Sequence, residues 1–296
     1  MRTDPDSGAP RWRIGVIGGS GLYDFAGLED AQDIAVSSPF GEPSGPVTLG
    51  RIGLVDFVFL ARHGKGHRIP PHQINARANI DVLKRCGVTD VLAISAIGSL
   101  REELAPGSFV AVDQFIDRTH GRVDTFFDDG LVAHVSMADP VCARLAALAA
   151  NAAEAASATV HRGGCYLAMQ GPQFSTRAES RMYRQWGADV IGMTALPEAR
   201  LAREAELPYA LLGMVTDYDS WREGEHVEVA DVLRVMAANT ALARETIVRL
   251  AELLPVARVP SPIDHALDGA IMTARSQRDQ VLAAKLGAIA SRALRD

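Results

Sequence analysis

The chain has 296 residues, of which 48% are hydrophobic and 22% charged, a composition typical of globular proteins that bury a substantial core. Its 30 basic and 36 acidic residues give a net charge of −6, and the sequence contains no block of lysine or arginine. This charge pattern argues against nucleic acid as a partner.

The start of the chain is polar and contains proline and glycine, and the apolar run after it is short. We therefore expect a flexible segment at residues 1–12, with neither a signal peptide nor a membrane span. The cysteines, Cys86, Cys142 and Cys165, are scattered and have no CxxC spacing. This argues against disulfides and against a zinc site, so we expect reduced thiols in a cytoplasmic protein.

Short apolar runs typical of β-strands alternate with longer helical patterns along the chain. The expected strands are residues 12–17, 53–61, 89–96, 108–116, 165–170, 188–193 and 208–215. The expected helices are residues 73–87, 139–157, 176–187, 196–206 and 229–254. Several strand runs are apolar on both faces, as in a sheet that helices cover on both sides. The sequence therefore predicts an α/β fold with a mixed central β-sheet flanked by helices.

The length suits one large α/β domain or two smaller ones. No repeat and no convincing linker precedes residue 255, where a proline-rich connector begins, so we expect a single domain at residues 13–255. Residues 279–295 have apolar positions at helical spacing. We expect residues 256–296 to form a helical extension packed on the domain.

Residues that suit ligand binding follow several expected strands. GGSG at residues 18–21 is a turn whose backbone N–H groups can converge on an anion, although a tight chain reversal has the same pattern. It is not a Rossmann fingerprint, because Asp24 stands where the third glycine belongs. Arg62 and His63 follow the run 53–61, at the end of a strand where α/β sheets place ligands, and they suit a small oxyanion.

Three later segments also lie at or near the end of an expected strand. The small residues of SAIGS at 95–99 allow a ligand to approach the backbone closely. Phe174 offers a flat apolar face to an aromatic ligand, and Met193 and Thr194 end another expected strand. VTDYDSW at 215–221 places two carboxylates directly after a buried run. Taken singly, each feature is equally consistent with packing or with a solvated turn.

Taken in chain order, these segments resemble one family. GGSGL, ARHGKGH, SAIGSLREEL, DQFIDRT, QGPQFSTRAES, WGADVIGMT and VTDYDSW are similar to the motifs of the trimeric purine nucleoside phosphorylases, specifically the methylthioadenosine phosphorylases. The resemblance covers about residues 13–250. It implies phosphorolysis of 5′-methylthioadenosine to adenine and 5-methylthioribose 1-phosphate. It also implies a homotrimer that needs no cofactor or metal, with inorganic phosphate as a co-substrate.

The resemblance assigns roles to individual residues. It implies phosphate binding by Ser20, Arg62, His63, Ser95 and Ala96. It implies binding of the purine base by Phe174, Ser175, Asp217 and Asp219. It implies contacts with the ribose and methylthio group by Met193, Thr194, His134, Val227, Val229 and Val232, with His134 reaching the substrate of a neighbouring subunit. The loop between Trp221 and Val227 is one residue shorter than in some relatives, which leaves the register of the three valines open.

The chemistry of phosphorolysis suits these assignments. The reaction passes through an oxocarbenium-like ribosyl cation, so the phosphate must be held in line and the leaving adenine must gain a proton. We expect Asp217 to be the catalytic proton donor to N7 and Asp219 to accept from the 6-amino group. Burial and like charge raise the pKa of one carboxyl in such a pair.

Other functions stay open on the sequence alone. The nearest is a phosphorylase of the same fold that prefers methylthioinosine or 6-oxopurine nucleosides, for which asparagine would be expected at position 217. A hydrolytic nucleosidase has no use for a phosphate cradle of the kind expected at Arg62 and His63. A non-catalytic nucleoside-binding regulatory module would be expected to carry an appended DNA-binding or signalling segment, and the sequence contains none.

Overall fold

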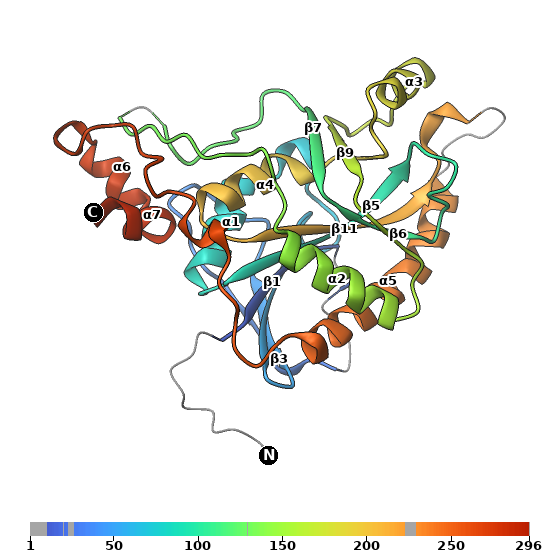
Figure 1. Ribbon diagram of the computed structural model, residues 1–296, viewed down its shortest axis with the longest axis horizontal. Helices are drawn as coiled ribbons and strands as arrows, with labels where there is room; N and C mark the ends of the chain where they lie inside the picture. Colours follow the sequence, from blue (N-terminus) through green and yellow to red (C-terminus); the bar gives the residue numbers. More distant parts are fainter. Residues whose placement is uncertain (1–10, 20, 23–26, 129, 223–228, 296) are drawn as a thin grey trace.

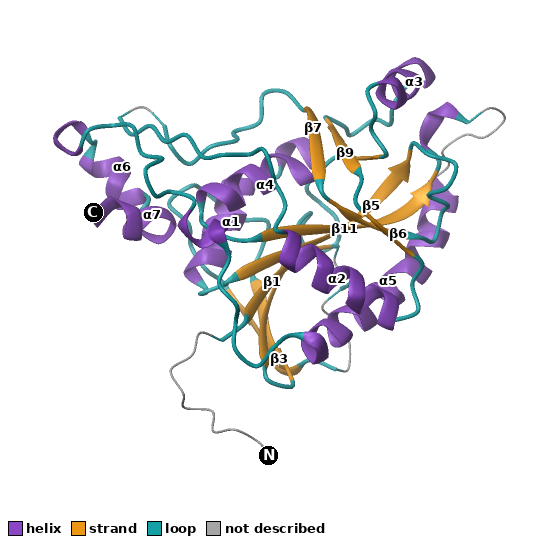
Figure 2. Ribbon diagram, viewed as in Figure 1, coloured by secondary structure: helices purple, strands orange, loops and turns teal. Residues whose placement is uncertain are grey.

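The computed structural model describes residues 11–19, 21–22, 27–128, 130–222 and 229–295 (Figure 1). Within these ranges the chain forms one mixed sheet with helices packed on its two faces (Figure 2). The predicted α/β fold is therefore confirmed. None of the helices in the described ranges is both long enough and apolar enough to cross a membrane.

The sheet is organised around β5, which pairs with three other strands. In its first half β5 lies between β1 and β11, and all three run parallel; β4 continues the parallel set beside β1. At its end β5 pairs with β10 in the antiparallel direction. The strands are β1 Arg13–Gly18, β2 Glu29–Ile34, β3 Val47–Ile52, β4 Val55–Ala61, β5 Asp90–Ser99, β6 Phe109–Val112, β7 Gln114–Arg118, β8 Val160–Arg162, β9 Cys165–Met169, β10 Val190–Gly192 and β11 Tyr209–Asp217.

Alternate residues of the central strands are buried against different helices, as the pleat requires. Val91 and Ala93 of β5 belong to a core cluster with residues of α1, α4 and α7, whereas Leu92 and Ile94 belong to a second cluster with residues of α2 and α5. The helices are α1 Ala76–Arg85, α2 Ala143–Ala155, α3 Arg177–Gln185, α4 Ala195–Glu204, α5 Val229–Leu253, α6 Gln280–Lys285 and α7 Gly287–Arg295. Burial on both faces explains why the strand sequences read as continuous apolar runs.

Several elements differ from the sequence prediction. Strands β3 and β8 were not predicted, and the run 108–116, predicted as one strand, forms β6 and β7, which pair with different neighbours. Strand β2 was not predicted, because it is an edge strand with an exposed, largely polar sequence. The run 53–61 was predicted as one strand, but Gly53, with a φ of +58°, and the exposed Leu54 form the turn between β3 and β4. The helical pattern at 279–295 is divided into α6 and α7 at Leu286.

The C-terminal extension contacts the domain through both apolar and charged groups. Leu286 and Ile289 are buried in the cluster that contains α1 and α4. The buried carboxylate of Glu206, just after α4, accepts hydrogen bonds from the backbone N–H of Leu267 and from Arg292 of α7. The connector is held by Arg258, whose guanidinium donates to Asp90 and Asp264.

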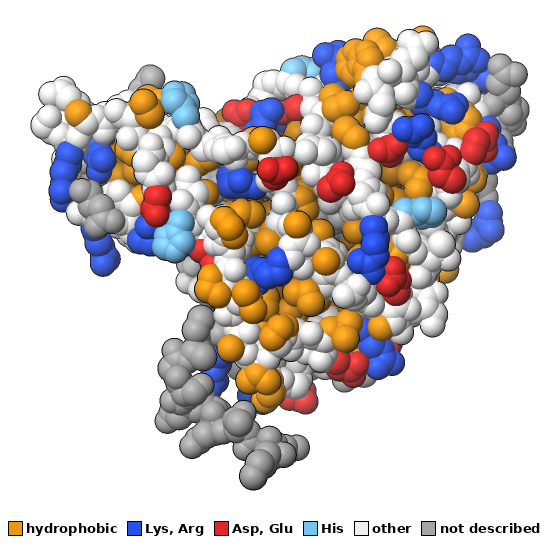
Figure 3. All heavy atoms as spheres, viewed as in Figure 1, with side chains coloured by type: hydrophobic (Ala, Val, Ile, Leu, Met, Phe, Trp, Pro, Cys, Tyr) orange, Lys and Arg blue, Asp and Glu red, His pale blue; other side chains and the backbone are white. Residues whose placement is uncertain are grey.

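On the face drawn in Figure 3, acidic and basic side chains are interspersed. Proteins that bind nucleic acid concentrate basic residues in a stripe or patch, which is a different arrangement.

We predict that Leu286→Ala lowers the free energy of unfolding by about 2–5 kcal/mol, because Leu286 is fully buried and its truncation leaves a cavity. Chemical denaturation followed by circular dichroism measures this loss. Val281→Ala, at an exposed position of α6, is the control and should change the value by about 0.5 kcal/mol at most. If both variants unfold like the parent chain, the extension does not pack on the domain in solution.

Candidate active site

The candidate site lies where the parallel strands end. Because β4, β1, β5 and β11 run in the same direction, the residues after β1 and β4, the second half of β5 and the end of β11 meet at one edge of the sheet. Strand β10 approaches this edge from the opposite direction. The residues that follow β10 therefore come back alongside the middle of β5.

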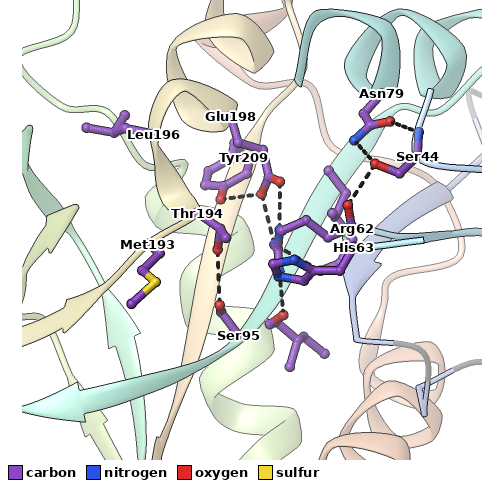
Figure 4. A network of polar contacts seen from close by, with 12 residues as sticks. Ser44, Arg62, His63, Asn79, Ser95, Met193, Thr194, Leu196, Glu198 and Tyr209 are labelled. Atoms are coloured by element: carbon purple, nitrogen blue, oxygen red, sulfur yellow. Dashed lines mark hydrogen bonds and ion pairs between the residues drawn. The ribbon is translucent and has the colours of Figure 1, made fainter. Parts of the chain in front are cut away.

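Arg62 is the most constrained of the predicted phosphate ligands. Its side chain is buried, and its Nε–H and one Nη2–H donate to the two carboxylate oxygens of Glu198, at 2.9 and 3.0 Å (Figure 4). Further hydrogen bonds reach the carbonyl oxygens of Ile94, at 3.1 Å, and Ile17, at 3.3 Å. Burial works against the charge, but Glu198 more than offsets it, and the pKa of Arg62 is raised. A guanidinium has five N–H groups, so a single one on Nη1 stays available to a ligand.

His63 is held in one tautomer. Its Nδ1 lies 2.9 Å from the carbonyl oxygen of Ile69 and can only donate to it, so in the neutral ring Nε2 is an acceptor. Burial, with smaller contributions from Arg62 and His67, lowers the pKa of His63 to about 4. The ring also stacks on His67, with ring centroids 4.1 Å apart. At neutral pH His63 can therefore accept a hydrogen bond from a protonated phosphate oxygen but adds no positive charge.

Ser95 and Thr194 bring two hydroxyl groups together. Their Oγ atoms lie 3.3 Å apart, and both residues are buried (Figure 4). Ser95 and Ala96 lie within β5 and not after it, because the strand continues to Ser99. The backbone N–H of Thr194 donates to the hydroxyl of Tyr166, which fixes the residue that follows Met193.

Asp217 is a half-buried carboxyl with hydrogen bonds to both oxygens. The backbone N–H of Asp219 donates to Oδ1 at 2.8 Å, and the hydroxyl of Thr216 lies 2.7 Å from Oδ2. The same hydroxyl is 3.2 Å from the carbonyl oxygen of Ile97. Since a hydroxyl has one hydrogen, it can donate to ionised Asp217, or donate to Ile97 and accept from protonated Asp217. Burial raises the pKa of Asp217, which favours the protonated form.

Asp219 and Gly98 lie next to Asp217. Asp219 has a φ of +47°, which is unusual for a residue with a side chain, and its buried Oδ2 has no hydrogen-bond partner among the described residues. Burial also raises the pKa of Asp219. Gly98 of β5 lets the carboxyls approach, because a Cβ there would lie 3.0 Å from Oδ1 of Asp217. A buried, unpaired carboxyl oxygen is suited to an amino group of a ligand.

Phe174 and Ser175 lie beside the segment that carries the two aspartates. The carbonyl oxygen of Ser175 accepts a hydrogen bond from the hydroxyl of Ser220, at 2.8 Å. Ser175 is buried, whereas Phe174 is about half exposed. The exposed ring is available to stack on an aromatic ligand.

No hydrogen bond within the described residues joins His134 or Val232, two of the remaining predicted residues, to this cluster. His134 is exposed, and its backbone N–H donates to the carbonyl oxygen of Ala270 in the C-terminal extension. Val232 of α5 is half-buried. Ser20 and Val227 lie outside the described residues, as does the side chain of Val229.

The sequence analysis missed two supporting polar residues, the buried Glu198 and the half-buried Arg122. Glu198 pairs with Arg62, and its Oε1 also accepts from the hydroxyl of Tyr209, at 2.9 Å. Arg122 donates to the carbonyl oxygens of Met193, Leu196 and Gln170 at 2.7–2.8 Å, and so connects the segments before Phe174 and around Thr194. The sequence carried no signal for the pairing of Arg62 with Glu198, because the need of Arg62 for an acceptor follows from its burial in the folded chain.

The described residues contain no group of three or more histidine, cysteine, aspartate or glutamate side chains placed to hold a metal ion.

Comparison with known proteins places this geometry in a family. Residues 13–251 match the model of the phosphorylase superfamily. The chain is 54% identical to the S-methyl-5′-thioadenosine phosphorylase of Bradyrhizobium diazoefficiens, over 95% of this chain and 98% of the relative. It is also 54% identical to the enzyme of that name from Cereibacter sphaeroides, over the same shares of the two chains. The chain belongs to the S-methyl-5′-thioadenosine phosphorylases of the phosphorylase superfamily.

Solved structures agree with this placement. A methylthioadenosine phosphorylase from an antarctic soil metagenomic library superposes with a TM-score of 0.90 at 42% identity, covering 94% of this chain and 99% of the other. The methylthioadenosine phosphorylase of Schistosoma mansoni, solved in complex with adenine, gives a TM-score of 0.81 at 36% identity, covering 88% of this chain and 99% of the other. The family predicted from the motifs is confirmed.

We predict that Arg122→Lys raises the KM for the nucleoside by about tenfold and lowers stability, because a lysine ammonium cannot reach acceptors on both segments and leaves buried carbonyls unpaired. Steady-state kinetics at saturating phosphate, together with thermal unfolding, measure both effects. Arg162→Lys, which changes an exposed arginine paired with Glu154, is the control and should alter neither. Parent-like kinetics in Arg122→Lys would mean that this arginine does not position the site.

Proposed function

We propose that this chain cleaves the N-glycosidic bond of 5′-methylthioadenosine with inorganic phosphate, giving adenine and 5-methylthioribose 1-phosphate. The observation that carries the proposal is the placement of two carboxyls, the half-buried Asp217 and the buried Asp219, at the same sheet edge as the hydroxyls of Ser95 and Thr194 and the guanidinium of Arg62. Membership of a family whose relatives carry this activity in their names supports it.

The phosphate side of the site supplies donors and one charge. In the proposed mechanism phosphate accepts hydrogen bonds from Arg62, from Ser95 and from the backbone near Ala96. The resemblance assigned Thr194 to the ribose, but its hydroxyl lies 3.3 Å from that of Ser95, so the proposed mechanism gives it a hydrogen bond to phosphate instead. His63 accepts from a protonated phosphate oxygen through Nε2, as its tautomer requires. Held in this way, one phosphate oxygen attacks the anomeric carbon as the ribosyl cation forms, so part of the barrier is removed by positioning.

The purine side controls the leaving group. As the bond to N9 breaks, electrons flow into the ring, and protonated Asp217 donates its proton to N7 so that neutral adenine leaves. The raised pKa of Asp217 supports this role, because it keeps the proton on the carboxyl to a higher pH than an exposed aspartate would. Asp219 accepts from the 6-amino group through Oδ2, and Phe174 stacks on the ring. The mechanism uses no cofactor and no metal.

We also infer that the active enzyme is a homotrimer in the cytoplasm. His134 is exposed and is paired with the C-terminal extension, which suits a residue that serves a neighbouring subunit. The side chains of Val132 and Met272 on the two paired segments are exposed as well, and burial against another subunit would cover them. Three free cysteines support a reducing compartment.

We predict that adenine release from methylthioadenosine requires inorganic phosphate. The loss of absorbance on conversion to adenine, followed with and without phosphate, tests the proposed function directly.

Ser95→Ala should raise the KM for phosphate by about threefold to tenfold, because one hydrogen bond to a charged group is lost. Turnover that is equally fast without phosphate would identify the chain as a hydrolase.

We predict that Asp217→Asn loses most of kcat on methylthioadenosine while substrate binding persists, because the amide keeps the shape but has no acidic proton. The same variant should gain relative activity on methylthioinosine, since its amide N–H can donate to a 6-oxo base. The measurement is kcat/KM for both nucleosides, with Asp56→Asn, an exposed ion-pair partner, as the control. If the ratio of kcat/KM for methylthioadenosine to that for methylthioinosine is unchanged in Asp217→Asn, Asp217 does not discriminate between the two purines.

We predict that trimers assembled from two inactive variants, His134→Ala and Asp217→Asn, recover part of the phosphorolytic activity. His134→Ala and Asp217→Asn each disable a different half of a site shared between subunits, so co-expressed or re-associated mixtures should contain some sites with both residues intact. The readouts are activity of the mixture and the mass from sedimentation equilibrium. A fully active monomer, or a mixture no more active than its components, would rule out the shared site.

A further inference from the structure

The buried Arg62–Glu198 pair lies beneath the proposed phosphate site and raises a question of charge. Phosphate is a dianion at neutral pH, yet the one cation among its described ligands is paired with a carboxylate through both oxygens. His63, with its pKa of about 4, adds no charge. The electrostatic attraction between Arg62 and a phosphate dianion would be stronger without the negative charge of Glu198. The presence of Glu198 therefore calls for another explanation.

Glu198 fixes the plane of the guanidinium. A bidentate contact with two parallel N–H···O bonds defines both the position and the rotation of an arginine head group. The Tyr209 hydroxyl donates to Oε1 of Glu198 at 2.9 Å and orients the carboxylate in turn (Figure 4). All three side chains are buried, and Glu198 and Tyr209 come from α4 and β11, two elements of the rigid core.

We propose that Glu198 is a positioning residue for phosphate, oriented by Tyr209. Glu198 accepts from two N–H groups of Arg62, and backbone carbonyl oxygens accept from two more, which leaves the fifth for the phosphate. The inference rests on the proposed phosphorolytic function. It separates two roles of Arg62. Its position is set by Glu198 and by the carbonyl oxygens of Ile94 and Ile17, and its remaining N–H binds the ligand.

Whether Glu198→Gln strengthens or weakens phosphate binding distinguishes a positioning role of Glu198 from an electrostatic one. The substitution removes a negative charge near a dianion, so an electrostatic role predicts tighter phosphate binding. A glutamine has one acceptor oxygen and an NH₂ group that cannot accept from Arg62, so the bidentate contact is lost. If positioning dominates, phosphate binding weakens.

The test is the KM for phosphate at saturating methylthioadenosine and the KM for the nucleoside at saturating phosphate. We expect Glu198→Gln to raise the phosphate KM at least about tenfold, the effect of losing a charge-assisted contact, with the nucleoside KM within about twofold. Tyr209→Phe keeps the ring and the carboxylate and removes the orienting O–H, so we expect a smaller rise of about twofold to fivefold. This mild variant decides the question if Glu198→Gln does not fold.

A second carboxylate of α4 provides a matched control. Glu204 is also buried, but its oxygens accept from the backbone N–H of Phe126 and the hydroxyl of Thr125, and burial raises its pKa to about 7. Glu204→Gln should leave the phosphate KM unchanged. Phosphate should also raise the Tm of the parent chain and of Glu204→Gln by the same amount, and raise that of Glu198→Gln much less, because only the binding of phosphate is altered.

Two outcomes would overturn the inference. One is a phosphate KM that is unchanged or lowered in folded Glu198→Gln and unchanged in Tyr209→Phe. The other is a parallel rise of both KM values, which would mean a general loosening of the fold. If either outcome is found and the unmodified enzyme still requires phosphate for adenine release, only the role of Glu198 is refuted and the proposed function stands. A parent enzyme that does not require phosphate would refute the proposed function itself.

Discussion

The pairing of β5 with three strands is the constraint on which the candidate site depends. Its first half is fixed between parallel neighbours, β1 and β11, and its last residues are fixed to β10, which runs the other way. A purely parallel sheet would bring together only the loops at one edge. The antiparallel β10 adds a return segment, and this is why Thr194 reaches Ser95, at the middle of a strand. The hydroxyl of Ser95 therefore lies on the sheet itself, where the backbone has little freedom to move, and that of Thr194 lies beside it at the start of α4.

Much of the fold could be predicted from the sequence because burial leaves a local pattern. Strands covered on both faces read as apolar runs, and β1, β4, β5 and β11 were found in this way. The edge strand β2 has no such pattern, because its side chains are exposed and polar. Its strand conformation comes from pairing with β3, which is a tertiary effect that a local pattern does not contain.

The residues of the candidate site were only partly predictable from the sequence. Motifs pointed to the residues proposed to face the ligand, such as Arg62 and Asp217, because a motif records residue types at fixed spacing. They did not identify Glu198, which is 136 residues from Arg62 in the chain and lies in a helix with an ordinary amphipathic pattern. Which buried cation meets which buried anion is decided by topology. The supporting residues of a site are therefore harder to predict than the ligand-facing ones.

The arm that carries His134 has a consequence for biosynthesis. Residues 132–134 pair with residues 270–273 through a bridge at Ala133 and Ile271 and through hydrogen bonds of Val132 and His134. The described strands of the sheet are complete by residue 217, whereas the partner of the arm leaves the ribosome more than fifty residues later. Because the chain is synthesised from its N-terminus, every described strand of the sheet has been made before residues 270–273 exist, and the arm can be fixed only after they do. In the proposed trimer, His134 could therefore serve a neighbouring subunit only after the C-terminal extension had been synthesised.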